Sequence, residues 1–203
     1  MRQLILLPAV APILVAVSAY GTCLWAVYAH LVPAARDCGL ADADGARAVS
    51  VAGLCGAAGR VVVGAYADAR GVSRTRLLVA CLVAGGLAVL ALGAATPRVC
   101  AERAGGPGAP AALFFAVAAG FGFFSGAVVA QVPPLLADEV GVENLPLAAG
   151  LNYLVQAPFV LLAPPLAGAL RDARGTYTVV WCVVGVAMSV SPLILLRLKS
   201  AYT

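Results

Sequence analysis

The chain has 203 residues, of which 63% are hydrophobic and only 11% are charged, and its formal net charge is +4. Soluble domains carry about 25% charged residues, so this composition excludes an ordinary water-soluble protein and indicates a membrane protein. The positive charge is small and dispersed, with a single lysine at Lys199, and therefore does not predict nucleic-acid binding.

Six apolar runs follow one another along the chain, and each is long enough to cross a bilayer as a helix. A bilayer core of about 30 Å needs about 20 apolar residues in a helix. The predicted spans are 8–32, 46–67, 77–96, 110–136, 145–169 and 177–197. The start of the first run is similar to a secretory signal peptide, but apolar character continues through "TCLWAVYAHLV" and favours a true span. The sequence thus predicts an all-α, multi-pass membrane protein.

Small residues cluster inside several of these runs, as in "AGLCGAAG" at 52–59 and "AAGFGFFSGA" at 118–127. Membrane helices pack closely where Gly and Ala allow their backbones to approach. We expect these two clusters to be packing faces.

A short polar phrase occurs twice, as "GAYADARG" at 64–71 and "GALRDARG" at 168–175, and the two copies agree at six of eight positions. The first copy ends the second span and the second copy ends the fifth. Three spans separate the two ends, an odd number, so the copies are expected on opposite faces of the membrane. Residues of about 5–96 and 110–197 then form two three-helix units of inverted orientation, which is typical of secondary transporters. The alternative is chance agreement between two turns with similar requirements.

The residue types in the two copies suit a helix end. Each Asp is expected to cap the following helix or to pair with an Arg. The final Gly of each copy is expected to take a left-handed turn. The residues predicted to form this loop motif are Gly64, Asp68, Arg70, Gly71, Asp172, Arg174 and Gly175. Apart from Arg60, Lys and Arg number six on each side, so charge alone does not fix the orientation, although the cluster "RGVSRTR" favours the cytoplasm for the first copy.

The six cysteines show no CxxC spacing, which argues against a zinc or redox site. Four lie in apolar runs, while Cys38 and Cys100 lie in polar connections and could form a disulfide; the sequence leaves this pairing open. Nucleotide-binding, zinc-protease and serine-hydrolase motifs are all absent, and a single histidine cannot build a multi-His metal site. We therefore expect no enzyme, no cofactor and no metal.

Arg60 is the only Lys, Arg, Asp or Glu well inside an apolar run. A charge at membrane depth costs about 2.5–3.5 kcal/mol on insertion scales, so such a residue usually faces a cavity and serves function. Its guanidinium can bind a carboxylate with two hydrogen bonds. The alternative is that Arg60 extends its long side chain toward the membrane surface.

Neutral polar residues in the first and fifth spans could line a path beside Arg60, and the predicted substrate-binding set is Arg60, Tyr28, Asn152 and Gln156. Gln131 and Tyr153 are further polar groups near these spans, and each of the neutral residues could instead serve helix packing. His30, the sole histidine, could relay a proton, but its place at the end of the first span favours an interfacial role.

The loop "GAYADARGVSRTR" resembles the loop signature of the major facilitator superfamily, with the Arg displaced by one place to Arg70. The segment 140–186 resembles the end of monocarboxylate-transporter-like proteins, and "VYAHLVPAARDCGL" at 27–40 resembles the end of that family's seventh helix. The matching stretches are Val140-Gly141, Ala148 to Leu151, Pro164 to Gly168 and Asp172 to Tyr177. The resemblance implies the C-terminal six helices of a twelve-helix transporter, which is half of a major facilitator fold.

In the resembled family, an Arg at the place of Arg60 is implicated in substrate and proton handling, commonly with an Asp four residues earlier. That place is Gly56 here, so coupling to protons through that pair is not expected. The resemblance implies transport of a small organic anion, such as a monocarboxylate, by alternating access at the plasma membrane, with proton coupling left open. Its expected partners are the lipid bilayer, the anion, and a missing N-terminal half or second subunit. The alternative is a non-transporting or truncated half that assembles with, or regulates, another membrane transporter.

Overall fold

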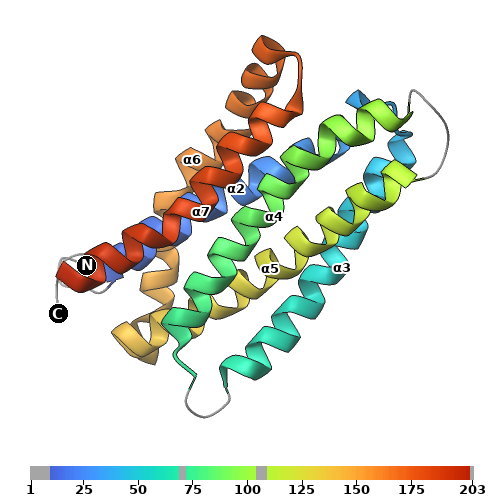
Figure 1. Cartoon of the computed structure of the whole chain (residues 1–203). Helices are drawn as coiled ribbons and strands as arrows, with labels where there is room; N and C mark the ends of the chain where they lie inside the picture. Colours follow the sequence, from blue (N-terminus) through green and yellow to red (C-terminus); the bar gives the residue numbers. More distant parts are fainter. Residues whose placement is uncertain (1–9, 69–71, 104–108, 202–203) are drawn as a thin grey trace.

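The computed structural model describes residues 10–68, 72–103 and 109–201, and these fold into a bundle of long helices (Figure 1). In chain order the elements are α2 (Val10–Asp37), α3 (Asp42–Ala67), α4 (Arg74–Arg103), α5 (Ala109–Val140), the short 3-10 helix η1 (Val142–Asn144), α6 (Leu145–Arg174) and α7 (Tyr177–Ala201).

Each predicted span coincides with one of these helices, and the helices extend beyond the apolar runs. The apolar run measures the bilayer core, whereas a helix ends only where turn residues stop it. Thus α4 continues to Arg103, past the predicted end at 96. Within the described part of the chain, five helices, α2 to α6, are long and apolar enough to cross a membrane, while the apolar stretch in α7, Tyr177–Leu193, is shorter. The protein is a multi-pass membrane protein.

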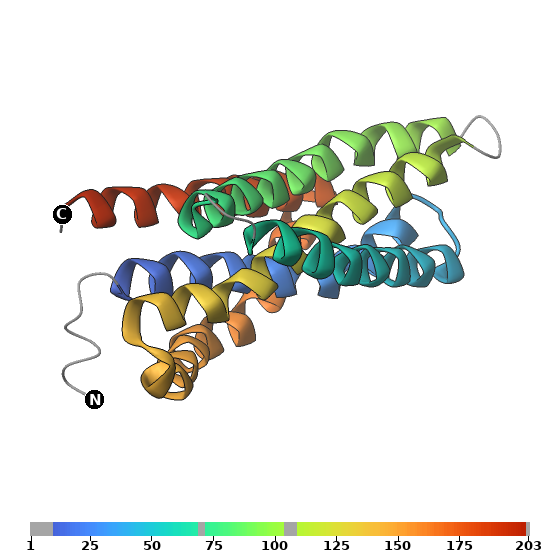
Figure 2. The same ribbon diagram turned by 90° about the horizontal axis from the view of Figure 1, so that it is seen from below.

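The helices pack in a defined order. The most extensive contacts join α3 to α5, α4 to α5 and α4 to α7, followed by α2 with α6 and α7. Figure 2 shows α4 and α7 side by side along one edge of the bundle. The most strongly buried apolar window belongs to α2, at 56%, whereas α3 and α6 bury only 28% and 17%. A large part of the α3 and α6 surfaces therefore has no protein neighbour within the described residues.

Bulky side chains fill the centre, while glycine brings α3 and α5 together. Trp181, Tyr20 and Phe121 are almost completely buried. Between α3 and α5 the backbones themselves touch: a Cβ added at Gly122 would overlap the carbonyl of Ala52. The same is true of Gly126 against the Gly56 carbonyl and of Gly59 against the Phe123 carbonyl. We call this contact the glycine seam, and it confirms that the two small-residue clusters are packing faces.

Candidate functional site

Arg60 lies on α3 with its side chain exposed, and it forms no hydrogen bond or ion pair with any residue that the structure describes. Gly53, Ala57 and Gly64 share its face of the helix, since their spacing follows the helical repeat. A Cβ added at Gly53 or Gly64 would meet nothing within 4 Å. Small neighbours thus leave the guanidinium open to a ligand.

The other two faces of α3 differ in character from the face of Arg60. One is the glycine seam, with Gly56 and Gly59 buried against α5. The other carries bulky apolar side chains that are strongly exposed, including Leu54 at 75% and Val61 at 72%. Bulky apolar side chains suit lipid, so the open stripe around Arg60 lies between the lipid-compatible face and the packed seam.

Gly56, which stands where the resembled family carries an acid, packs tightly against α5. A Cβ at Gly56 would lie 3.1 Å from the carbonyl oxygen of Gly122. A larger side chain at this position therefore requires the neighbouring backbone to shift by a few tenths of an ångström.

Two of the predicted polar residues, Asn152 and Gln156, lie one turn apart on α6 and are buried against α2. They line a cavity of about 170 Å³ between α2, α5 and α6. The amide of Gln156 lies directly against Gly21 of α2, where a Cβ would overlap it. Tyr20 also lines this cavity, although nothing in the sequence distinguishes it from a core tyrosine.

The cavity has an apolar wall and a few polar groups, which is the usual make-up of a small-molecule site. Its apolar lining includes Val128 and Leu136 of α5, and the exposed side chains of Trp25 and Tyr153 also line it. The Oδ1 atom of Asn152 has no hydrogen-bond partner among the described residues, although it is buried. Buried acceptors are normally paired, so an unpaired one calls for an explanation such as a bound molecule.

The remaining predicted residues lie elsewhere. Neither Arg60 nor Tyr28 lines this cavity. Tyr28 is half-buried and packs against Phe121 of α5, with ring centroids 5.3 Å apart. Gln131 is buried between α5 and α4, where its Nε2 donates to the Cys81 sulfur at 3.5 Å. The structure therefore joins Asn152 with Gln156, but it does not gather the whole predicted set into one pocket.

His30 joins three helices. Its Nε2 lies 2.8 Å from the carbonyl oxygen of Pro164, and because a carbonyl only accepts, this nitrogen donates. Its Nδ1 then accepts from the hydroxyl of Tyr177 at 3.0 Å. Gly168, in the second copy of the repeated phrase, lies beside the imidazole ring, whose Cε1 would be in ordinary contact, at 3.6 Å, with an added Cβ. These contacts support a packing role for His30.

The first copy of the repeated phrase forms an ionic cluster at one end of the bundle. Asp68 ends α3, and Arg74 begins α4. The guanidinium of Arg74 donates to Asp68 at 3.1 Å and to both oxygens of Asp138, on α5, at 3.1 and 3.2 Å. One arginine thus ties three helices together, and Gly64 lines a small pocket beside it. The predicted positions Arg70 and Gly71 lie outside the described residues.

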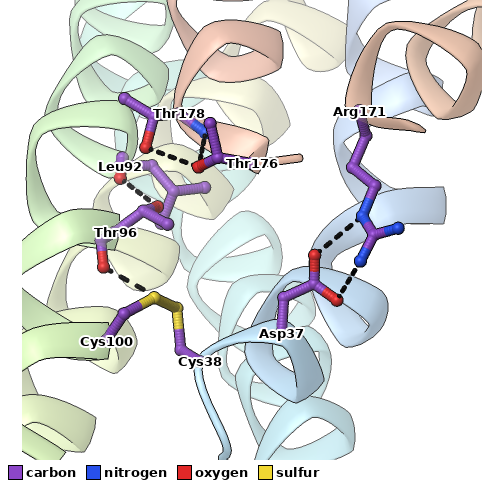
Figure 3. Close-up of a disulfide and its surroundings, with 8 residues drawn as sticks. All are labelled: Asp37, Cys38, Leu92, Thr96, Cys100, Arg171, Thr176 and Thr178. Carbon is purple, nitrogen blue, oxygen red and sulfur yellow. Dashed lines mark hydrogen bonds and ion pairs between the residues drawn. A yellow bond between two sulfur atoms is a disulfide. The ribbon is translucent and has the colours of Figure 1, made fainter. Parts of the chain in front are cut away.

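The second copy forms a different cluster at the opposite end. Arg171 of α6 donates from two nitrogens to the two oxygens of Asp37 on α2, at 2.8 Å each, and Figure 3 shows this paired geometry. Arg171 also donates to Asp172 at 3.0 Å. Gly175 takes the predicted left-handed conformation, with φ 69°, and its N–H bonds the Arg171 carbonyl; Arg174 is exposed.

We expect the charge pair between α2 and α6 to stabilise the bundle. The variant Asp37→Asn removes one charge of a half-buried pair between helices distant in sequence, with side-chain exposures of 35% and 27%. It should lower the melting temperature of the detergent-solubilised protein by a few degrees.

The matched control is Asp42→Asn, which breaks the similarly two-pronged pair with Arg36. That pair is local and more exposed, at 66% for each partner, so solvent screens it. Equal melting temperatures for the two variants would contradict the assignment of a structural role to the α2–α6 pair.

The comparison with protein-family models gives no match. Curated proteins do match. The chain is 31% identical to monocarboxylate transporter 12 of Xenopus laevis over 163 residues, which are 79% of this chain and 33% of the relative. It is 36% identical to monocarboxylate transporter 11 of Mus musculus over 151 residues, 74% of this chain and 32% of that protein. It is also 36% identical to monocarboxylate transporter 3 of Rattus norvegicus over 155 residues, 76% of this chain and 29% of the relative.

The chain thus spans about a third of the length of the curated relatives it matches. The similarity extends over roughly three quarters of the chain and agrees with its membrane-spanning helices. Over this segment the chain is similar to the monocarboxylate transporters, which supports a monocarboxylate transporter-like family.

Proposed function

We propose that this chain is one six-helix half of a secondary or facilitative transporter that moves a small, monocarboxylate-like organic anion across the plasma membrane by alternating access. The observation that carries the proposal is Arg60. It is a cation without a partner among the described residues, on an open stripe of small residues of a membrane-spanning helix, in a chain similar to monocarboxylate transporters. A cation at this depth is stabilised by a wet path and an anion, and its two-pronged guanidinium matches a carboxylate.

The packing order supports an inverted repeat of two three-helix units, α2 to α4 and α5 to α7. In such a repeat α2 corresponds to α5, α3 to α6 and α4 to α7. The contact of α3 with α5 then corresponds to that of α6 with α2, and the contact of α4 with α5 to that of α7 with α2. The pair of α4 with α7 corresponds to itself. Inverted repeats of this kind underlie alternating access in secondary transporters.

The exposed surfaces support a missing counterpart. The two least buried membrane-spanning windows belong to α3 and α6, and the relatives are about three times as long as the segment they share with this chain. A second half, from the same polypeptide or another subunit, would cover the stripe around Arg60 and close a central path. The cavity with Asn152 and Gln156 would then supply neutral hydrogen-bonding groups to the carried molecule or to its water.

Uptake by the full-length gene product tests the proposal. We expect cells or proteoliposomes that contain it to accumulate radiolabelled lactate or pyruvate saturably. Unlabelled carboxylate should compete, whereas the uncharged amide of the same acid should not, because it lacks the anion that Arg60 would bind. Uptake equal to that of protein-free membranes for a panel of small carboxylates would contradict transport and would favour the alternative, a half that only assembles with another transporter.

A further inference from the structure

At the end of the bundle that carries Arg171, a disulfide joins the connection after α2 to the last turns of α4. Cys38 directly follows α2, and Cys100 lies near the end of α4; their Cα atoms are 4.3 Å apart and 62 positions separate them in the sequence (Figure 3). Away from this bond, α2 and α4 make few contacts, because α5 and α7 take up most of the α4 surface. The bond is therefore the main link between the ends of α2 and α4.

The chemistry of the bond carries information about its compartment. Cytosolic thiols are kept reduced by glutathione and thioredoxin, whereas disulfides persist in oxidising compartments. The bond therefore assigns the end of the bundle that contains Cys38, Cys100 and Arg171 to the non-cytosolic side. The cluster of Asp68, Arg74 and Asp138 lies at the other end of α4 and so faces the cytosol. This assignment is independent of the count of Lys and Arg, which is balanced between the two sides.

We propose that the Cys38–Cys100 bond is a reducible cross-link on the non-cytosolic face, open to thiols or phosphines that reach that side. Cys38 is only 5% exposed, while Cys100 is half-buried and more accessible. A thiolate arriving from that side attacks the Cys100 sulfur, and Cys38 leaves as a thiolate that takes up a proton. A second external thiol then displaces Cys100 from the mixed disulfide. The protein gains two electrons and two protons, and the two external thiols depart as their own disulfide.

Opening this bond would release α4 while leaving α2 attached to α6. Neighbouring residues at the end of α2 point in two directions: Asp37 binds Arg171 of α6, and Cys38 binds Cys100 of α4 (Figure 3). The end of α2 thus carries two links: a covalent one to α4, in the same three-helix unit, and an ionic one to α6, in the other unit. Reduction removes only the covalent link.

Differential alkylation of the full-length protein in cells tests the proposal without any transport assay. A membrane-impermeant trialkylphosphine, which leaves as its oxide with oxygen from water, is followed by an impermeant maleimide. The treatment is applied to intact cells, to cells whose plasma membrane alone is opened with digitonin, and to cells whose membranes are all dissolved. Peptide mass spectrometry then measures how much Cys100 carries the label.

We expect Cys100 to be labelled only after phosphine treatment, and then in most of the protein molecules. The label should appear in intact cells if the bond faces the cell exterior, or only after all membranes are dissolved if it faces the lumen of an organelle. In the variant Cys38→Ser, Cys100 should be labelled without phosphine, at the same permeabilisation stage at which the phosphine-treated wild type is first labelled. A cysteine placed at the exposed Ser73 (Ser73→Cys), at the opposite end, should first be labelled after digitonin. Labelling of wild-type Cys100 without phosphine, or its first labelling at the digitonin step, would overturn the proposal.

Discussion

Replacing Arg60 with glutamine is expected to lower carboxylate uptake by tenfold or more at a fixed, subsaturating substrate concentration. A hydrogen bond to a charged group contributes about 1.5–3 kcal/mol, and each 1.4 kcal/mol is a factor of ten in affinity. Glutamine keeps a polar group on a shorter side chain and loses the charge and the two-pronged fork. The conservative variant Arg60→Lys should retain the attraction for the carboxylate but lose the paired geometry. Its uptake should therefore lie between that of the wild type and that of Arg60→Gln.

The matched control for Arg60 lies on the same helix. Arg47, near the start of α3, is 71% exposed and, of the residues that the structure describes, bonds only the nearby Asp44, so Arg47→Gln should leave uptake unchanged. Surface abundance of each variant must be measured in parallel, so that lost transport is distinguished from lost protein. If Arg60→Gln transports as well as wild type at equal abundance, Arg60 only extends toward the membrane surface, and the anion site lies elsewhere.

Adding a single methyl group at the glycine seam should strongly destabilise the protein. In Gly122→Ala the new Cβ would overlap the Ala52 carbonyl, and a backbone atom cannot swing away as a side chain does. Overpacking of this kind costs about 1–3 kcal/mol, and occasionally more. We expect a markedly lower melting temperature in detergent and a smaller fraction of protein that elutes as a single species.

The matched control is Gly120→Ala, two residues earlier on the same helix. A Cβ at Gly120 meets nothing within 4 Å, so the change adds helix propensity without a clash. Its melting temperature should equal or exceed that of wild type. Similar destabilisation by both alanines would mean that the α3–α5 contact is looser than the structure has it, and that helix-wide effects cause the loss.

The helices were predictable from the sequence because a run of about 20 apolar residues has one physical solution in a bilayer. Their ends were less predictable: α2 extends to Asp37 rather than 32 because the helix continues into the polar connection. Arg60 was recognisable from the sequence since it is an isolated charge in an apolar run. Its open stripe also follows from the spacing of Gly53, Ala57 and Gly64.

Contacts between distant segments were beyond the sequence alone. Asp37 meets Arg171 across 134 positions, and Arg74 meets Asp138 across 64, and neither pairing leaves a local pattern. The partnership of Cys38 with Cys100 was one of several arrangements compatible with the sequence, and the structure selects it. Tyr20 and the approach of Gln156 to Gly21 depend on how α2 and α6 face each other, which an apolar run does not encode.

The glycine seam has a mechanical consequence. Since the backbones of α3 and α5 interlock without side chains between them, sliding either helix by one residue would drive carbonyls into α-carbons. The two helices come from different three-helix units, so the glycine seam couples these units rigidly. Any large motion of the protein must then occur at contacts made by flexible side chains, outside the seam, and α3, α5 and Arg60 would move together.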